Sequence, residues 1–273
     1  MALPDREPRP LPSARALLLN SVVAALIAGA LMILVHELAH LVTGLLRGHG
    51  GTLYPFGVIH HGELTVTEDV VTLLAGPAFS LVTGILLQVW SPLRGRADLA
   101  HLVWVWFAFA SVQEGVTYLC LTPFGVGDTG MAAQLMGLPV VAQFVLLLAG
   151  IGGMFANARA FAPHMARLAG EDPVRRNAVT LFPWLWGMIA SVLLALLYLV
   201  LSDAGLGAGE QIAVLAAGTG TFVFAPMAHI FAGRVRGVAA EPQRLRPVPV
   251  PGLALLAVLI AGNIALTAGL SIG

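Results

Sequence analysis

The chain alternates long apolar stretches with short polar connections, and this pattern predicts a bundle of membrane-spanning helices. Crossing the roughly 30 Å hydrocarbon core of a bilayer takes about 20 residues of helix, at a rise of about 1.5 Å per residue. Seven stretches are long enough, at 16–46, 68–90, 99–121, 138–160, 180–202, 210–232 and 251–271. We therefore expect an all-α polytopic membrane protein with about seven transmembrane helices.

The connection between the first two stretches favours strands rather than helix. It reads GTLYPFGVIHHGELTVTED, in which Leu53 to Ile59 and Glu63 to Thr67 have strand character. We place the turn between them at His61-Gly62 and expect a short membrane-associated β-hairpin.

The predicted helices divide the chain into three parts. Residues 1–15 form a polar N-terminal tail, which we interpret as preceding a retained membrane helix, because the apolar run after it is too long for a signal peptide. Residues 16–137 contain the first three helices, the hairpin and a glycine-rich loop. Residues 138–273 contribute four further helices, to which the sequence assigns no role.

Composition agrees with lipid as the main solvent. Only 10% of the residues are charged and 58% are hydrophobic, whereas a soluble domain is about 25% charged. All 14 basic residues are arginines, and no cluster of them is dense enough to follow a phosphate backbone, so we expect no nucleic-acid partner.

The arginines are distributed unequally between the two sides of the predicted bundle. Arg47 stands alone on one side. The other thirteen fall on the opposite side: Arg6, Arg9, Arg15, Arg94, Arg96, Arg159, Arg167, Arg175, Arg176, Arg234, Arg236, Arg244 and Arg246. Since arginine-rich connections stay in the cytoplasm, this asymmetry predicts a cytoplasmic N-terminus, in a multi-pass protein of a bacterial cytoplasmic membrane.

The first stretch contains the motif HELAH, at residues 36–40. On a helix His36 and His40 project from one face, so both imidazoles can reach one zinc ion, and Glu37 stands beside them as a general base. Chance places such a motif in this composition about 0.007 times. Ionisable groups are costly within a membrane helix and indicate function. The alternative is a polar lining of a transport cavity.

A catalytic zinc ion needs a third protein ligand, and two acidic residues are candidates. Asp128 lies in LTPFGVGDTGM, after the third stretch, and reaches the same side of the membrane as the histidines. It could instead cap the helix that follows. Glu114, in the third stretch, lies at a matched depth and is either a ligand or a hydrogen-bonding partner of a ligand histidine.

Three segments resemble the site-2 protease family of intramembrane metalloproteases. HELAH resembles its zinc helix, AGPAFS at 75–80 its small-residue segment, and PFGVGDTG at 123–130 its proline-to-aspartate motif. Where the family commonly has Asp-Gly, this chain has Asp128-Thr129, and no asparagine directly precedes Pro123. The resemblance covers roughly 16–137.

The resemblance implies one Zn²⁺ held by His36, His40 and Asp128, with Glu37 as the base of a peptide hydrolase. It also implies that membrane-associated protein segments are the substrates. The hairpin would then clamp an unwound substrate strand, through a substrate-binding set of Phe56, Gly57, Val58 and Pro123. Three alternatives remain at this stage: an inactive relative that binds membrane proteins, a transporter that uses the same residues as a relay, and a zinc-dependent membrane hydrolase of a non-peptide substrate.

Overall fold

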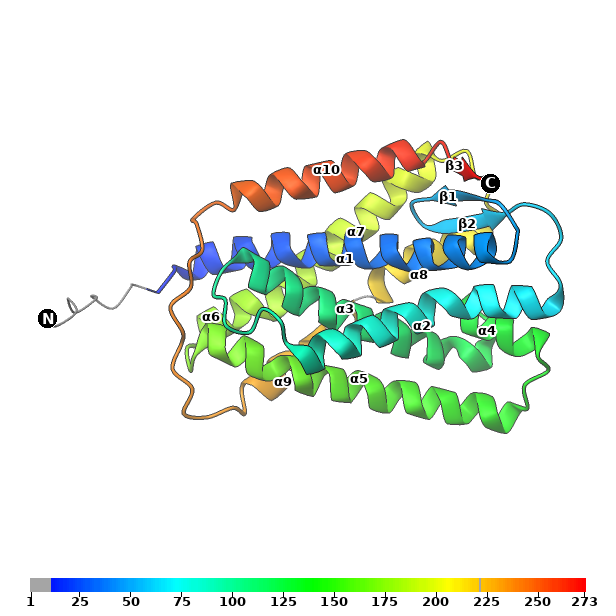
Figure 1. Ribbon diagram of the computed structural model, residues 1–273. Helices are drawn as coiled ribbons and strands as arrows, with labels where there is room; N and C mark the ends of the chain where they lie inside the picture. The colour runs from blue at the N-terminus through cyan, green and yellow to red at the C-terminus, as the bar shows by residue number, and fades with distance from the viewer. Residues whose placement is uncertain (1–10, 221) are drawn as a thin grey trace, which may run out of the picture.

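The computed structural model describes residues 11–220 and 222–273, and it consists of helices with one small sheet (Figure 1). The helices are α1 (Ala14–Leu46), α2 (Val66–Trp90), α3 (Leu99–Leu121), α4 (Gly127–Leu135), α5 (Val140–Ala169), α6 (Pro173–Val179), α7 (Leu181–Leu201), α8 (Ala208–Gly220), α9 (Ala225–Ala232) and α10 (Val250–Leu266), with a 3-10 turn, η1, at Thr122–Phe124. The strands are β1 (Gly51–Tyr54), β2 (Gly57–His60) and β3 (Leu270–Ile272).

The predicted class of fold is confirmed. Within the described residues, six helical stretches are long and apolar enough to cross a membrane: 14–46, 66–90, 99–124, 140–169, 173–201 and 208–232. The seventh, α10, is apolar but has only 17 residues. Large apolar side chains such as Val89 and Val200 are about four-fifths exposed, as expected where lipid replaces water.

Three of the predicted spans differ in detail from the observed helices. The fourth is longer than expected, because α5 continues to Ala169. The sixth is broken into α8 and α9, since glycines end α8 and Pro226 lies in the first turn of α9, where a missing N–H costs nothing. The seventh ends at Leu266, and part of its predicted length becomes β3 instead.

The β-hairpin exists, but its predicted turn is wrong. The strands pair from Gly51 with His60 to Tyr54 with Gly57, so the chain turns at 55–56 and not at His61-Gly62. The segment from Glu63 to Thr67, predicted as the second strand, leads into α2. Thr65 caps this helix in a reciprocal capping box with Glu68, which satisfies free N–H groups of the first turn.

A third strand, which the sequence analysis missed, completes the sheet. β3 pairs antiparallel with the other edge of β1, so the strand order is β2-β1-β3 and both edges of β1 are occupied. In Figure 1 the sheet lies at the end of the bundle where α1 ends, and α10 carries the chain back to it.

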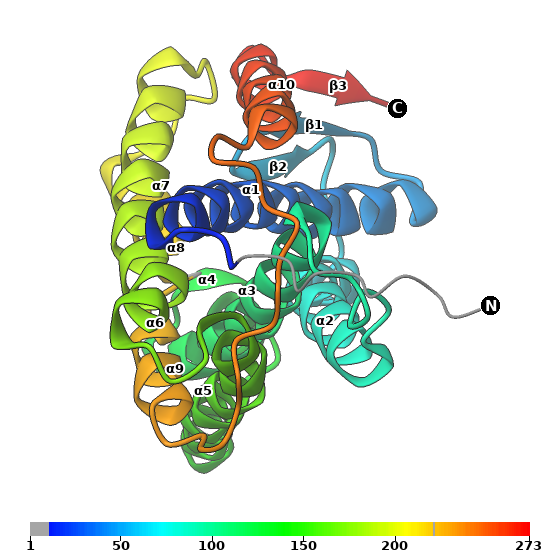
Figure 2. The ribbon, with the colours of Figure 1, turned by 90° about the vertical axis from the view of Figure 1, so that its left-hand side faces the viewer.

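The core is centred on α3, which packs against α1, α2 and α5 (Figure 2). Its side chains Trp106 and Phe109 are fully buried. The small-residue face of α2 is buried as well, at Thr72, Gly76, Ser80 and Gly84. A Cβ on Gly84 would lie 2.6 Å from the Val112 backbone nitrogen, so glycine there allows α2 and α3 to approach closely.

Connections that contain or adjoin arginines meet at the opposite end, where α1 begins. Residues 91–98, 170–172 and 233–249 all lie there (Figure 2). The last of these connections is pinned across the end of the bundle, because Arg167 forms a two-pronged ion pair with Glu241 and the Arg244 backbone N–H donates to the Ala97 carbonyl. The arginine hydrogen bonds hold the pKa of Glu241 below its usual value.

Candidate metal centre

Helix α1 brings His36 and His40 together near its C-terminal end. They lie one turn apart, about 15 and 9 Å before Leu46 at 1.5 Å per residue, and both are buried. Their Nε2 atoms are only 2.9 Å apart. The two rings meet edge to face, so both nitrogens point to one place.

The outer nitrogen of each ring has its own partner. His40 Nδ1 lies 2.7 Å from the backbone carbonyl of Thr72 on α2, and a carbonyl can only accept, so this nitrogen carries the proton. His36 Nδ1 lies 2.6 Å from Glu114 Oε1 on α3, and a carboxylate is likewise an acceptor. In a neutral imidazole, these partners leave each Nε2 atom unprotonated, with its lone pair facing inward.

Asp128 supplies a third inward-facing atom from a distant part of the chain. Its Oδ2 lies 3.2 Å from His36 Nε2 and 3.3 Å from His40 Nε2. Gly125 and Gly127, at φ +66° and +68°, turn the chain sharply between η1 and α4 and place Asp128 in the first turn of α4. The N-cap of α4 is Val126, without a side-chain cap bond, so Asp128 does not have the capping role considered above.

In this neutral form the three inner atoms are all acceptors. Two imidazole lone pairs and a carboxylate oxygen lie 2.9 to 3.3 Å from one another. Ligand atoms about 2.0–2.1 Å from a tetrahedral zinc ion are separated by roughly 3.3 Å. His36, His40 and Asp128 are therefore a group able to hold one metal ion.

Gly76 allows α2 to pass this cluster closely. A Cβ at this position would lie 2.4 Å from His40 Nε2 and 2.6 Å from His36 Nε2. Any side chain there would occupy the space in front of both nitrogens. Gly76 thus has a role beyond the helix packing that its spacing predicted.

The charges around the cluster also favour a cation. Glu37 and Asp128 are close enough to interact with both histidines, and Glu114 interacts with His36. Among the described residues, no arginine forms an ion pair with any of the three acids. Several acidic groups in a low-dielectric region are costly unless positive charge compensates them. A divalent ion between the histidines and Asp128 would provide it.

The acidic candidates occupy different positions. Glu114 lies behind His36, on the nitrogen that faces away from the cluster, which fits the second of its two predicted roles, as a partner of a ligand histidine. Glu37 is buried beside both histidines but is not among the converging ligand atoms. This arrangement leaves Glu37 free to act on a molecule at the metal.

The expected substrate-binding residues lie outside the cluster. Phe56 is in the hairpin turn, where its ring stacks on that of Tyr54. Gly57 and Val58 are the first two residues of β2, and Pro123 is in η1. β2 packs closely on α1 one turn beyond His40: a Cβ on Gly44 would lie 2.5 Å from the His60 ring.

Two residues of the site were missed in the sequence analysis. The Tyr118 ring stacks on His36, with centroids 5.4 Å apart and planes 13° apart. The Thr129 hydroxyl donates to the Tyr118 carbonyl at 2.5 Å, so Thr129 ties α4 to α3. The spacing of four residues between Glu114 and Tyr118, which puts both on one face of α3, could have indicated Tyr118.

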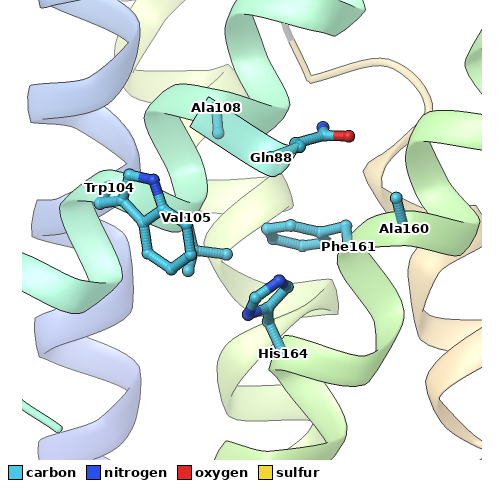
Figure 3. A pocket seen from close by; sticks show the side chains of 7 residues that line it. All are labelled: Gln88, Trp104, Val105, Ala108, Ala160, Phe161 and His164. Carbon is cyan, nitrogen blue, oxygen red and sulfur yellow. The ribbon is translucent and has the colours of Figure 1, made fainter. Parts of the chain in front are cut away.

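A separate small cavity lies between α2, α3 and α5 (Figure 3). It is lined by Gln88, Trp104, Val105, Ala108, Ala160, Phe161 and His164, and it measures about 10 Å³. This is the volume of about one water molecule. The cavity is too small for a substrate and contains none of the metal-centre residues.

The arrangement predicts different losses for the two acidic residues on the histidines. Asp128→Ala removes a ligand atom, whereas Glu114→Ala removes only the group that orients His36, which typically costs 10–100-fold in metal affinity. We expect the zinc affinity of purified protein, measured by chelator competition, to fall further for Asp128→Ala. The reverse ranking would exchange their assignments.

Comparisons with known proteins identify no relative. No family model matches the chain, and neither a curated protein nor a solved structure is significantly similar to it. The residues of the metal centre and the three short motifs are therefore what indicates a function.

Proposed function

We propose that this protein is an intramembrane zinc metallopeptidase that hydrolyses peptide bonds of membrane-associated proteins. The observation that carries the proposal is the convergence of His36 Nε2, His40 Nε2 and Asp128 Oδ2, with Glu37 directly beside them. Two histidines four residues apart on a helix with an adjacent glutamate are the zinc-peptidase arrangement.

The residues present fit a catalytic zinc ion. His36, His40 and Asp128 would hold it as three protein ligands and leave a fourth position open. When bound, zinc supplies Lewis acidity, which makes water a stronger nucleophile near neutral pH and polarises the scissile carbonyl.

Glu37 would move the protons of the reaction. A carboxylate next to the attacking water takes its proton as the water adds to the peptide carbonyl, and then returns a proton to the departing amine. Glu37 is buried, so little bulk water screens its interaction with a molecule at the metal.

The sheet offers places for an unwound substrate strand. Both edges of β1 are paired, so an added strand would use the free edge of β2 or of β3 or would displace β3. We favour the edge of β2, because β2 carries Gly57 and Val58 and packs on the metal-binding part of α1.

A proteome comparison tests the proposed activity. Membranes from cells producing wild-type protein and from cells producing Glu37→Gln are compared by mass spectrometry of new peptide N-termini. The proposal predicts termini within apolar segments that occur only with the wild type. Identical sets of termini would reject proteolysis and leave the inactive-relative, transporter and non-peptide hydrolase alternatives.

We also propose that the arginine-rich end lies in the cytoplasm, which puts the metal centre nearer the outer surface. With Cys120 replaced by alanine, single cysteines are placed at Gly95, at the arginine-rich end, and at Glu63, at the sheet end; both positions are exposed. An impermeant thiol reagent added to intact cells should label Glu63→Cys and spare Gly95→Cys. Labelling of Gly95→Cys alone would invert the orientation.

A further inference from the structure

Tyr118 lies between the two elements that carry the metal-binding residues. From α3 its ring stacks on His36 of α1. On the α4 side the ring packs on Gly127, where an added Cβ would be 2.9 Å from Tyr118 Cε1. The Thr129 hydroxyl holds the Tyr118 carbonyl, so both neighbours of Asp128 in sequence contact this tyrosine.

The Tyr118 hydroxyl also reaches Asp128 itself. The hydroxyl lies close enough to the Asp128 carboxylate to interact with it. Asp128 Oδ2 faces the two histidines, at 3.2 Å from His36 Nε2 and 3.3 Å from His40 Nε2. Oδ1 is therefore the oxygen that Tyr118 could hold while Oδ2 stays directed at the histidines.

We propose that Tyr118 is a positioning residue that fixes Asp128 as a metal ligand through one oxygen only. This inference rests on the metal centre of the proposed function and deepens it. Glu114 and Tyr118 lie one turn apart on α3 and then have parallel roles. Glu114 orients His36, and Tyr118 orients Asp128.

Single-oxygen coordination matters because a catalytic ion needs an open position. A carboxylate released from Tyr118 could bind through both oxygens and occupy the space intended for water. Held by the tyrosine, the ligand set stays at three protein atoms. A ring fixed by stacking on one side and by backbone on the other suits this task, because it limits the movement of the hydroxyl.

The test is Tyr118→Phe, which keeps the ring and removes the hydroxyl. The matched control is Tyr198→Phe, since Tyr198 is a buried tyrosine of α7 that interacts with Asn263 of α10 and, in the described part of the chain, with none of the metal-centre residues. Zinc affinity is measured by chelator competition on purified protein. The visible spectrum of the Co²⁺-loaded protein reports the number and geometry of ligands.

We expect Tyr118→Phe to weaken zinc binding 10–100-fold and to change the Co²⁺ spectrum, with Tyr198→Phe unchanged in both. In an Asp128→Ala background, Tyr118→Phe should cost nothing further, whereas a purely structural tyrosine would still weaken binding. Wild-type affinity and spectrum in Tyr118→Phe, or an undiminished loss in the Asp128→Ala background, would overturn the proposal.

These measurements need no peptide substrate, so they distinguish a failure of the proposed peptidase activity from a failure of the proposed role of Tyr118. A protein that binds zinc and cleaves nothing rejects the proposed activity and leaves the role of Tyr118 intact. A Tyr118→Phe variant that binds zinc normally rejects the positioning role alone.

Discussion

Replacing Glu37 by glutamine is expected to abolish peptide cleavage and to leave zinc binding intact. The substitution keeps the shape of the side chain but removes its ability to accept a proton. General bases contribute about 10²–10⁴-fold to rate, so the loss of turnover should be at least of this size. Zinc should be retained, because Glu37 is not one of the three converging ligands.

The measurement pairs zinc content with cleavage of a substrate identified by the proteome comparison. Glu63→Gln is the matched control, since it makes the same chemical change at an exposed glutamate of the same end of the bundle. Loss of zinc from Glu37→Gln would show that Glu37 is a ligand. Retained cleavage would show that another group takes the proton.

Replacing Gly76 by alanine is expected to weaken metal binding strongly while the bundle still forms. The added methyl group would lie 2.4 Å from His40 Nε2 and 2.6 Å from His36 Nε2, closer than real contacts allow. Since both ring positions are held by Thr72 and Glu114, the rings have little room to retreat. We expect zinc affinity to fall by at least about 100-fold, the upper end of losses at indirect partners of metal ligands.

Gly152→Ala is the control for this substitution, because Gly152 is also in a membrane-length helix and has open space where a Cβ would stand. Alanine there should leave zinc affinity unchanged. Thermal unfolding of the zinc-free proteins separates a local clash from a folding defect. Normal zinc affinity in Gly76→Ala would mean that α2 does not approach the histidines as described.

Sequence patterns predicted the long-range features that follow from simple geometry. The spacing of His36 and His40 put both on one helical face, and the alternation of helix directions brought Asp128 to the same level. The structure brings these three together. The apolar stretches predicted most helices of the bundle to within a few residues, except that α5 extends to Ala169, the sixth stretch is broken into α8 and α9, and α10 ends early.

Other features depended on contacts that the local sequence does not encode. The pairing of β3 with β1 joins residues more than 200 positions apart, and no short sequence motif predicts such a pairing. The choice between two roles for Glu114 required knowing on which side of His36 it lies. The hairpin turn, by contrast, was predictable: Tyr54-Pro55-Phe56-Gly57 has proline and glycine at positions typical of a β-turn, and Thr65 and Glu68 form a recognisable capping box.

Zinc X-ray absorption on the purified protein tests the central claim most directly. We predict one zinc ion per chain, surrounded by nitrogen and oxygen atoms at about 2.0–2.1 Å with the outer-shell pattern of two imidazoles. Absence of stoichiometric zinc, iron in its place, or a zinc environment without imidazoles would contradict a site built from His36, His40 and Asp128.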